Sequence, residues 1–144
     1  MSLISVIVAT YNWPQALRLS LESLKTQTDR DFEVIIADDG SRADTCELIK
    51  KIQADFPVPI EHVWIEDDGC RKTVVGNLAI AASKGNYLVF IDGDCIVQPD
   101  FIAQHRKLAE PGHLVTGSRI LSNKVLAQEM LSWSHCIFER FKRH

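Results

Sequence analysis

The sequence predicts an α/β fold in which a mostly parallel sheet is flanked by helices. Short apolar runs rich in β-branched residues alternate with segments whose apolar residues recur at helical spacing. The 144 residues suit one domain, and neither a repeat nor a long linker interrupts the alternation. Because a helix between two strands carries the chain back across the sheet, such strands pair in parallel and both sheet faces are covered.

The first two units each place a buried strand before an amphipathic helix. The strand Ser5–Thr10 is followed by Asn12-Trp13-Pro14, which supplies a helix cap candidate and puts Pro14 near the first turn. Phe32–Ala37 is the second strand, and its helix runs from Asp44 to about Phe56, before two prolines. The inward faces of the two helices are expected to be Leu17, Leu21 and Leu24, and Leu48, Ile49, Ile52 and Phe56.

The second half of the chain continues the alternation. Ile60–Ile65 and Tyr87–Ile91 are the next expected strands, and Thr73–Lys84 between them is a helix with Gly85 as a left-handed cap. Its expected inward residues are Val75, Leu78, Ala79 and Ala82. The remaining elements are expected to be a helix from Pro99 to about Leu108, a strand at Leu114–Leu121 and a helix at Val125–Phe141. Residues 1–121 would then form the core and residues 122–144 a helical tail.

Composition and charge exclude several classes of function. Sixteen basic and nineteen acidic residues give a net charge of −3, which predicts no nucleic-acid surface. The apolar runs are too short to cross a bilayer, and no secretion signal is recognised after Met1. The four cysteines are scattered and the histidines lack ligand spacing, so we expect reduced thiols, a packing role for Cys95, and a cytoplasmic protein.

Acidic residues follow three successive expected strands, at the point where each strand ends. They are Asp38 and Asp39, then Glu66, Asp67 and Asp68, then Asp92 and Asp94. Right-handed crossovers bring these loops to one edge of a parallel sheet, where ligands of such folds bind. Solvated turns explain any one group, because Asp and Gly are common after strands. Three groups at one edge favour a divalent cation, since hard cations prefer carboxylate oxygens.

The sharpest motif is Asp92-Gly93-Asp94, directly after an apolar strand. One carboxylate can face a ribose or a water molecule while the other reaches a metal ion, and Gly93 lets the backbone approach closely. The cation would bridge the two phosphates of a nucleotide diphosphate and stabilise it as a leaving group. Without the cation, the acidic edge would repel such a ligand.

The loop after the first strand, Thr10-Tyr11-Asn12, carries neither the dinucleotide-binding glycine motif nor a P-loop. Tyr11 can stack on a flat base, or it can serve as a lid on the core. Arg71, near the second acidic group, can reach a phosphate or a base, or it can form an exposed ion pair. Both residues are therefore binding candidates with a structural alternative.

Four segments together resemble the family 2 glycosyltransferases, which have the Rossmann-like GT-A fold. They are SVIVATYN (5–12), IIADDGS (35–41), GNLAIAASKGNYLVFIDGD (76–94) and QPDFI (98–102). The resemblance implies a nucleotide-diphospho-sugar donor, in the first place a UDP-sugar, together with Mn²⁺ or Mg²⁺. It also implies transfer with inversion to a glycan, lipid-linked glycan or polysaccharide acceptor. The stretch FIDGDCIVQPDF is similar to the subgroup that makes bacterial surface polysaccharides or chondroitin-like polymers.

Carried over by position, the resemblance implies eight nucleotide-binding residues and two metal ligands. The nucleotide-binding residues would be Thr10, Tyr11, Asn12, Asp38, Asp39, Arg71, Asp92 and Gly93. Asp39 would bind the base with Asp38 beside it, and Asp94 would ligate the metal, with Asp92 on the ribose, on metal-bound water or on the metal.

The resembled family places its catalytic base in a later acidic motif. After Leu121 only Glu129 and Glu139 are acidic, and both lie in helix-like sequence. We therefore expect the base to lie beyond residue 144 or on a partner, with residues 122–144 beginning a truncated acceptor-side region. The apolar spacing of this tail favours packing, with contact at the inner face of a membrane or homodimerisation as alternatives.

Two rival functions come from other classes. Haloacid-dehalogenase-like phosphatases also place D-x-D after an apolar strand, but at their first strand and with later motifs that this sequence lacks. A non-catalytic nucleotide-binding or interaction module with the same fold is the stronger rival. Nucleotide binding without sugar transfer would favour that module.

Overall fold

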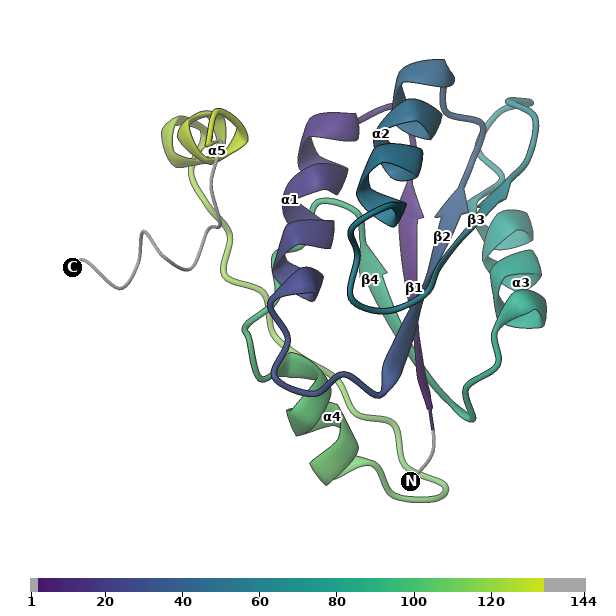
Figure 1. Ribbon diagram of the computed structural model, residues 1–144, viewed down its shortest axis with the longest axis vertical. Helices are drawn as coiled ribbons and strands as arrows, with labels where there is room; N and C mark the ends of the chain where they lie inside the picture. Colours follow the sequence, from purple (N-terminus) through teal and green to yellow (C-terminus); the bar gives the residue numbers. More distant parts are fainter. Residues whose placement is uncertain (1–2, 134–144) are drawn as a thin grey trace.

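The computed structural model describes residues 3–133 as a four-stranded parallel sheet with helices on both faces (Figure 1). The strands are β1 (Ile4–Thr10), β2 (Phe32–Asp38), β3 (Ile60–Trp64) and β4 (Tyr87–Asp92). The helices are α1 (Pro14–Lys25), α2 (Ala43–Gln53), α3 (Lys72–Ala82), α4 (Phe101–Leu108) and α5 (Lys124–Leu131). The predicted α/β fold is confirmed.

The sheet changes its direction of growth at β1. The strand order is β3-β2-β1-β4, so β2 and β3 are added on one side of β1 and β4 on the other. The register pairs Thr10 with Asp38 and Ala9 with Asp92, which aligns the carboxyl ends of the strands at one edge. The gap between the loops after β1 and β4 is therefore the topological switch point, where open parallel sheets bind ligands.

Alternate residues of β1 face opposite layers of the molecule. Val6 and Val8 pack in the cluster formed with α1 and α2, whereas Ile7 packs with Val75 and Ala79 of α3. Figure 1 shows the same arrangement, with α1 and α2 on one face of the sheet and α3 on the other. Four of the residues predicted to face inward from α1 and α2 are fully buried: Leu17, Leu21, Leu24 and Ile49.

Two helix ends differ from the sequence expectations. Trp13 is the N-cap of α1 and makes no side-chain cap bond, while Asn12 adopts a positive φ of 46° and its side chain accepts a hydrogen bond from the Arg42 backbone. Gly85 is no left-handed cap, because α3 ends in the extended Ser83 and the positive-φ glycines of residues 3–133 lie elsewhere. Glycine is needed at position 85 because a Cβ there would lie 2.5 Å from Ser5 Oγ.

The α3 side of the sheet is covered less completely than predicted. Leu78, expected to face inward, is exposed, although Val75 and Ala79 on the same helix are buried. The neighbouring strand β4 likewise exposes Phe90. One helix therefore covers only part of this face within the described residues.

The expected fifth strand is wrong, because Leu114–Leu121 contains no strand. Leu114, Ile120 and Leu121 are 87%, 100% and 83% exposed, so no packed layer holds this segment against the sheet. Helix α5 follows and brings Met130 and Trp133 against Leu19 of α1. It ends at Leu131, so the expected Val125–Phe141 helix is too long at Ser132 and Trp133, and residues 134–141 lie outside the described residues. Among residues 3–133, no helix is long and apolar enough to cross a bilayer.

Candidate functional site

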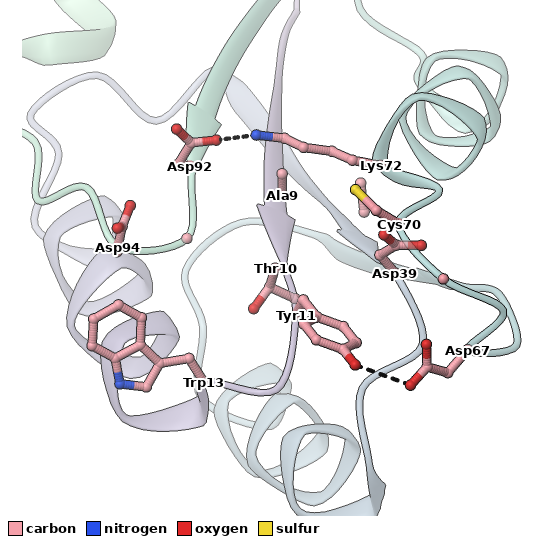
Figure 2. Close-up of a pocket in the computed structure, with 13 residues that line it drawn as sticks. Ala9, Thr10, Tyr11, Trp13, Asp39, Asp67, Cys70, Lys72, Asp92 and Asp94 are labelled. Carbon is pink, nitrogen blue, oxygen red and sulfur yellow. Dashed lines mark hydrogen bonds and ion pairs between the residues drawn. The ribbon is translucent and has the colours of Figure 1, made fainter.

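A pocket of about 390 Å³ opens at the carboxyl edge of the sheet, between the loops after β1 and β4 (Figure 2). Its volume lies in the range of small-molecule sites. Four carboxylates and one ammonium group line it: Asp39, Asp67, Asp92, Asp94 and Lys72. The structure thus brings one or more acids from each of the three predicted acidic loops into a single cavity.

Asp39 is buried, and one of its two oxygens has no partner. Its Oδ2 accepts a hydrogen bond from the Arg71 backbone N–H at 2.8 Å, whereas Oδ1 is buried without a hydrogen-bond partner among residues 3–133. A buried acceptor without a donor costs free energy. Because Asp39 lines the pocket, an N–H group of a ligand there would satisfy this oxygen.

Asp38, the neighbour of Asp39, does not line the pocket. Its side chain is 1% exposed, with Oδ1 accepting from the Ser41 backbone N–H and Oδ2 lying 2.8 Å from His62 Nε2. Both oxygens are therefore engaged in holding the loop after β2 against β3. The structure separates Asp38 from Asp39 and gives Asp38 the role of shaping the loop that carries its neighbour.

Ser41 connects the loop after β1 with the last residues of β2 and β3. Its backbone N–H binds Asp38, its Oγ accepts from the Asn12 backbone, and its carbonyl accepts from Trp64 Nε1. Asn12, predicted to bind a nucleotide, does not line the pocket, and its side chain accepts from the Arg42 backbone at 2.9 Å. We assign Asn12 to loop anchoring.

Two aromatic side chains stand on different sides of the pocket (Figure 2). Tyr11 is 52% exposed and donates its hydroxyl to Asp67 Oδ2 at 3.0 Å, so its ring lines the cavity and is no lid on the core. Trp13 is 47% exposed and lies on the side of Asp94. In the sequence, Trp13 marks only the start of a helix.

Asp92 and Asp94 fit a hard divalent cation. One oxygen of each carboxylate and the Cys95 Sγ all lie within 4.8 Å of one another. Burial, and then the nearby charge of Asp94, raises the pKa of Cys95. Mn²⁺ and Mg²⁺ are hard cations that prefer oxygen over sulfur ligands. The cation would therefore be held through carboxylate oxygens, and the packing role predicted for Cys95 suits its half-buried position.

Gly93 holds this pair of aspartates close to β1. Its N–H donates to the Ala9 carbonyl at 2.7 Å, and a Cβ at position 93 would lie 2.7 Å from that same oxygen. The close approach predicted for Gly93 is therefore present, and it is made to β1. Thr10, at the end of β1, lines the pocket beside it.

Lys72 was missed by the sequence analysis. It opens α3 and places its Nζ 2.5 Å from Asp92 Oδ1, while Arg119 Nη1 lies 3.8 Å from Oδ2 of the same carboxylate. Arg71, which precedes Lys72 in the sequence, does not line the pocket and directs its guanidinium to the Glu66 carbonyl. A lysine at the start of the helix that follows an acidic loop was the available signal.

Comparison with known proteins relates the chain to sugar transferases. The family described as glycosyl transferase family 2 matches residues 5–144. The chain is 37% identical over 108 residues to the uncharacterized glycosyltransferase YfnE of Bacillus subtilis, covering 74% of this chain and 26% of YfnE. It is 34% identical over 95 residues to WfaP of Escherichia coli, a UDP-Glc:alpha-D-GlcNAc-diphosphoundecaprenol beta-1,3-glucosyltransferase, covering 65% of this chain and 36% of WfaP.

A solved structure extends the similarity to the fold. The mannosyltransferase PcManGT from Pyrobaculum calidifontis, in complex with GDP-Man and Mn²⁺, superimposes with a TM-score of 0.66 at 26% sequence identity. The match covers 75% of this chain and 32% of PcManGT. The chain thus spans between about a quarter and just over a third of the length of these three proteins.

Proposed function

The chain belongs to glycosyl transferase family 2 and has its GT-A fold, and from this premise we propose that it carries the donor site of a metal-dependent glycosyltransferase. The donor is a nucleotide-diphospho-sugar, with a UDP-sugar as the first candidate. One observation carries the proposal: Asp39, whose Oδ1 is buried without a partner among the described residues, lines the same pocket as Asp92 and Asp94. The cavity therefore offers a base acceptor and a cation site together.

The chemistry of Asp39 favours a base that presents an N–H group. Uracil carries such a donor at the ring atom N3 and guanine at N1, whereas cytosine has an acceptor at N3 and donates only from its N4 amino group. Tyr11, exposed beside Asp39, offers a ring on which a flat base can stack. The printed name of WfaP gives UDP-Glc as its donor, which supports uracil, and the GDP-Man bound to PcManGT makes guanine the second candidate.

The acidic lining requires a cation if a diphosphate is to bind. A Mn²⁺ or Mg²⁺ ion at Asp92 and Asp94 would supply the positive charge that links the protein carboxylates to the diphosphate and stabilises it as it leaves. Gly93 sets the backbone that carries both aspartates, and Thr10 borders the cavity at the end of β1. The Mn²⁺ in the PcManGT complex supports this assignment.

We further propose transfer with inversion to a glycan or lipid-linked glycan. WfaP, by its name, uses a sugar linked to diphosphoundecaprenol, which supports an acceptor of this class and a place at the inner face of the membrane. The later acids Asp100, Glu110 and Glu129 are exposed and do not line the pocket. The catalytic base is therefore proposed to come from sequence that the longer relatives have in addition, or from a partner.

Calorimetry with UDP, GDP and CDP, each with and without Mn²⁺, tests the donor site. We expect UDP to bind, to bind more tightly with Mn²⁺, and to be preferred over CDP. Equal affinity for UDP and CDP together with no effect of Mn²⁺ would contradict the proposal.

Catalysis needs a separate measurement of donor hydrolysis and sugar transfer. Metal-dependent UDP binding without either activity, even when the acceptor-side sequence of a relative is supplied, would favour the rival function of a non-catalytic nucleotide-binding module.

A further inference from the structure

Within residues 3–133, Lys72 is the single basic side chain among those that line the pocket. Its Nζ lies 2.5 Å from Asp92 Oδ1, and the two side chains are 61% and 44% exposed. An exposed ion pair of this kind contributes little to stability, so it opens at small cost. The carboxylate that Lys72 holds is also one of the two proposed metal ligands.

An ammonium group and a divalent cation cannot both lie against Asp92 Oδ1, because both prefer carboxylate oxygens and they repel each other. We propose that Lys72 competes with the divalent cation for Asp92. When the cation binds, the Lys72 ammonium group leaves Asp92 and pairs with the diphosphate. This inference rests on the proposed function and deepens it, because it names a phosphate-binding residue and links the two ligands.

The position of Lys72 suits the diphosphate. Whatever binds a cation at Asp92 lies within reach of Nζ, which already contacts that carboxylate. Lys72 is also the first residue of α3, whose N-cap Arg71 makes no side-chain bond to the first turn. The ammonium group at the start of this helix therefore presents positive charge to the diphosphate.

A competition of this kind couples the two ligands. The diphosphate draws Lys72 from Asp92 and so favours the cation, and by reciprocity the cation favours the diphosphate. The coupling adds to the direct contact between cation and phosphate. Replacing Lys72 should therefore have opposite effects on the two ligands, whereas a general loss of structure would weaken both.

The chain offers a matched control in Lys25. Lys25 Nζ lies 2.5 Å from Asp55 Oδ2, so this is also an exposed Lys–Asp pair, and it does not line the pocket. Lys25→Met and Lys72→Met remove the same charge and the same kind of contact. Any difference between the two variants reports on the position of Lys72.

The experiment measures Mn²⁺ binding by the electron paramagnetic resonance signal of free Mn²⁺, and UDP binding by calorimetry at saturating Mn²⁺. We expect Lys72→Met to bind Mn²⁺ alone up to about fivefold more tightly than Lys25→Met, the range that an exposed ion pair allows. The same variant should bind UDP with Mn²⁺ roughly tenfold to 100-fold more weakly, as expected for the loss of a charge-assisted hydrogen bond. Lys72→Arg, which keeps the charge, should recover most of the UDP affinity.

Each outcome decides between the claims. If the wild-type chain binds UDP with Mn²⁺ but Lys72→Met matches Lys25→Met in both titrations, the inference is overturned and the donor site stands. If Lys72→Met weakens Mn²⁺ binding without nucleotide, the competition is overturned. If the wild-type chain shows no metal-dependent UDP binding, the proposed function fails, and the inference fails with it.

Discussion

Replacing Asp39 with asparagine changes one atom of the pocket and tests the base assignment. The Arg71 backbone N–H already donates to Oδ2 at 2.8 Å, so the introduced amide must turn its oxygen to Arg71 and its NH₂ group into the pocket. A donor then faces the N3–H of uracil in place of the buried acceptor Oδ1. The loss of a hydrogen bond to a charged acceptor is about 1.5–3 kcal/mol, or roughly 10- to 150-fold in the Kd for UDP.

The assay compares UDP with CDP at saturating Mn²⁺, so that the metal contributes equally to the binding of both nucleotides. We expect Asp39→Asn to lose affinity for UDP and to narrow the preference over CDP, because the NH₂ group can donate to N3 of cytosine. The variant should be at least as resistant to urea as the wild type, since the bond to Arg71 remains and an unpartnered carboxylate is removed. Asp68→Asn, an exposed acid outside the pocket, is the charge-matched control. An unchanged ratio of UDP to CDP affinity would refute the assignment of Asp39 to the base.

Three further predictions concern the metal, the close approach of β4 to β1, and pH. Asp94→Asn should abolish the increase in UDP affinity with Mn²⁺, measured by calorimetry, whereas Asp68→Asn should keep it; a retained increase in the first variant would exclude Asp94 as a ligand. Gly93→Ala should lower the free energy of unfolding, measured in urea, by about 1–3 kcal/mol, because its Cβ would lie 2.7 Å from the Ala9 carbonyl oxygen. Gly76→Ala, in open space on α3, is the control and should be neutral or stabilising. Equal effects of the two substitutions would contradict the packing argument. Burial lowers the pKa of His105, so the unfolded chain binds this proton first and stability should fall as the pH drops below the ordinary histidine value of about 6.5. His105→Gln should flatten this decline in urea unfolding while exposed His113→Gln should not, and parallel curves for all three proteins would refute it.

The four strands could be predicted from the sequence to within one residue at each end. Buried parallel strands are continuous apolar runs, so Phe32–Ala37 and Tyr87–Ile91 stand out against their polar flanks. The segment Leu114–Leu121 has apolar residues at both ends but Thr116, Gly117, Ser118 and Arg119 between them, and it has no strand. A strand requires a neighbour to pair with and a layer to cover it, and neither is visible in the local sequence.

The site was predictable as far as topology determines it. Asp39, Asp92 and Asp94 share a pocket because parallel strands end at one edge, which the alternation of elements already implies. Adjacent side chains near a strand end point to opposite sides, so Asp38 and Asp39 could not both enter the cavity, and the sequence did not tell which one would. The contact between Lys72 and Asp92 joins two loops, and its geometry depends on how α3 is placed.

The position of β1 in the sheet has a consequence for how the pocket is assembled. Tyr11 and Asp39 follow β1 and β2, which are neighbours in the chain, whereas Asp92 and Asp94 arrive with β4, the last strand to be synthesised among the described residues. The half that we propose for the base can therefore form before the half that we propose for the phosphates. A bound nucleotide diphosphate would contact both halves of the pocket, the half synthesised first and the half synthesised last. Its binding would therefore favour the docking of β4 against β1.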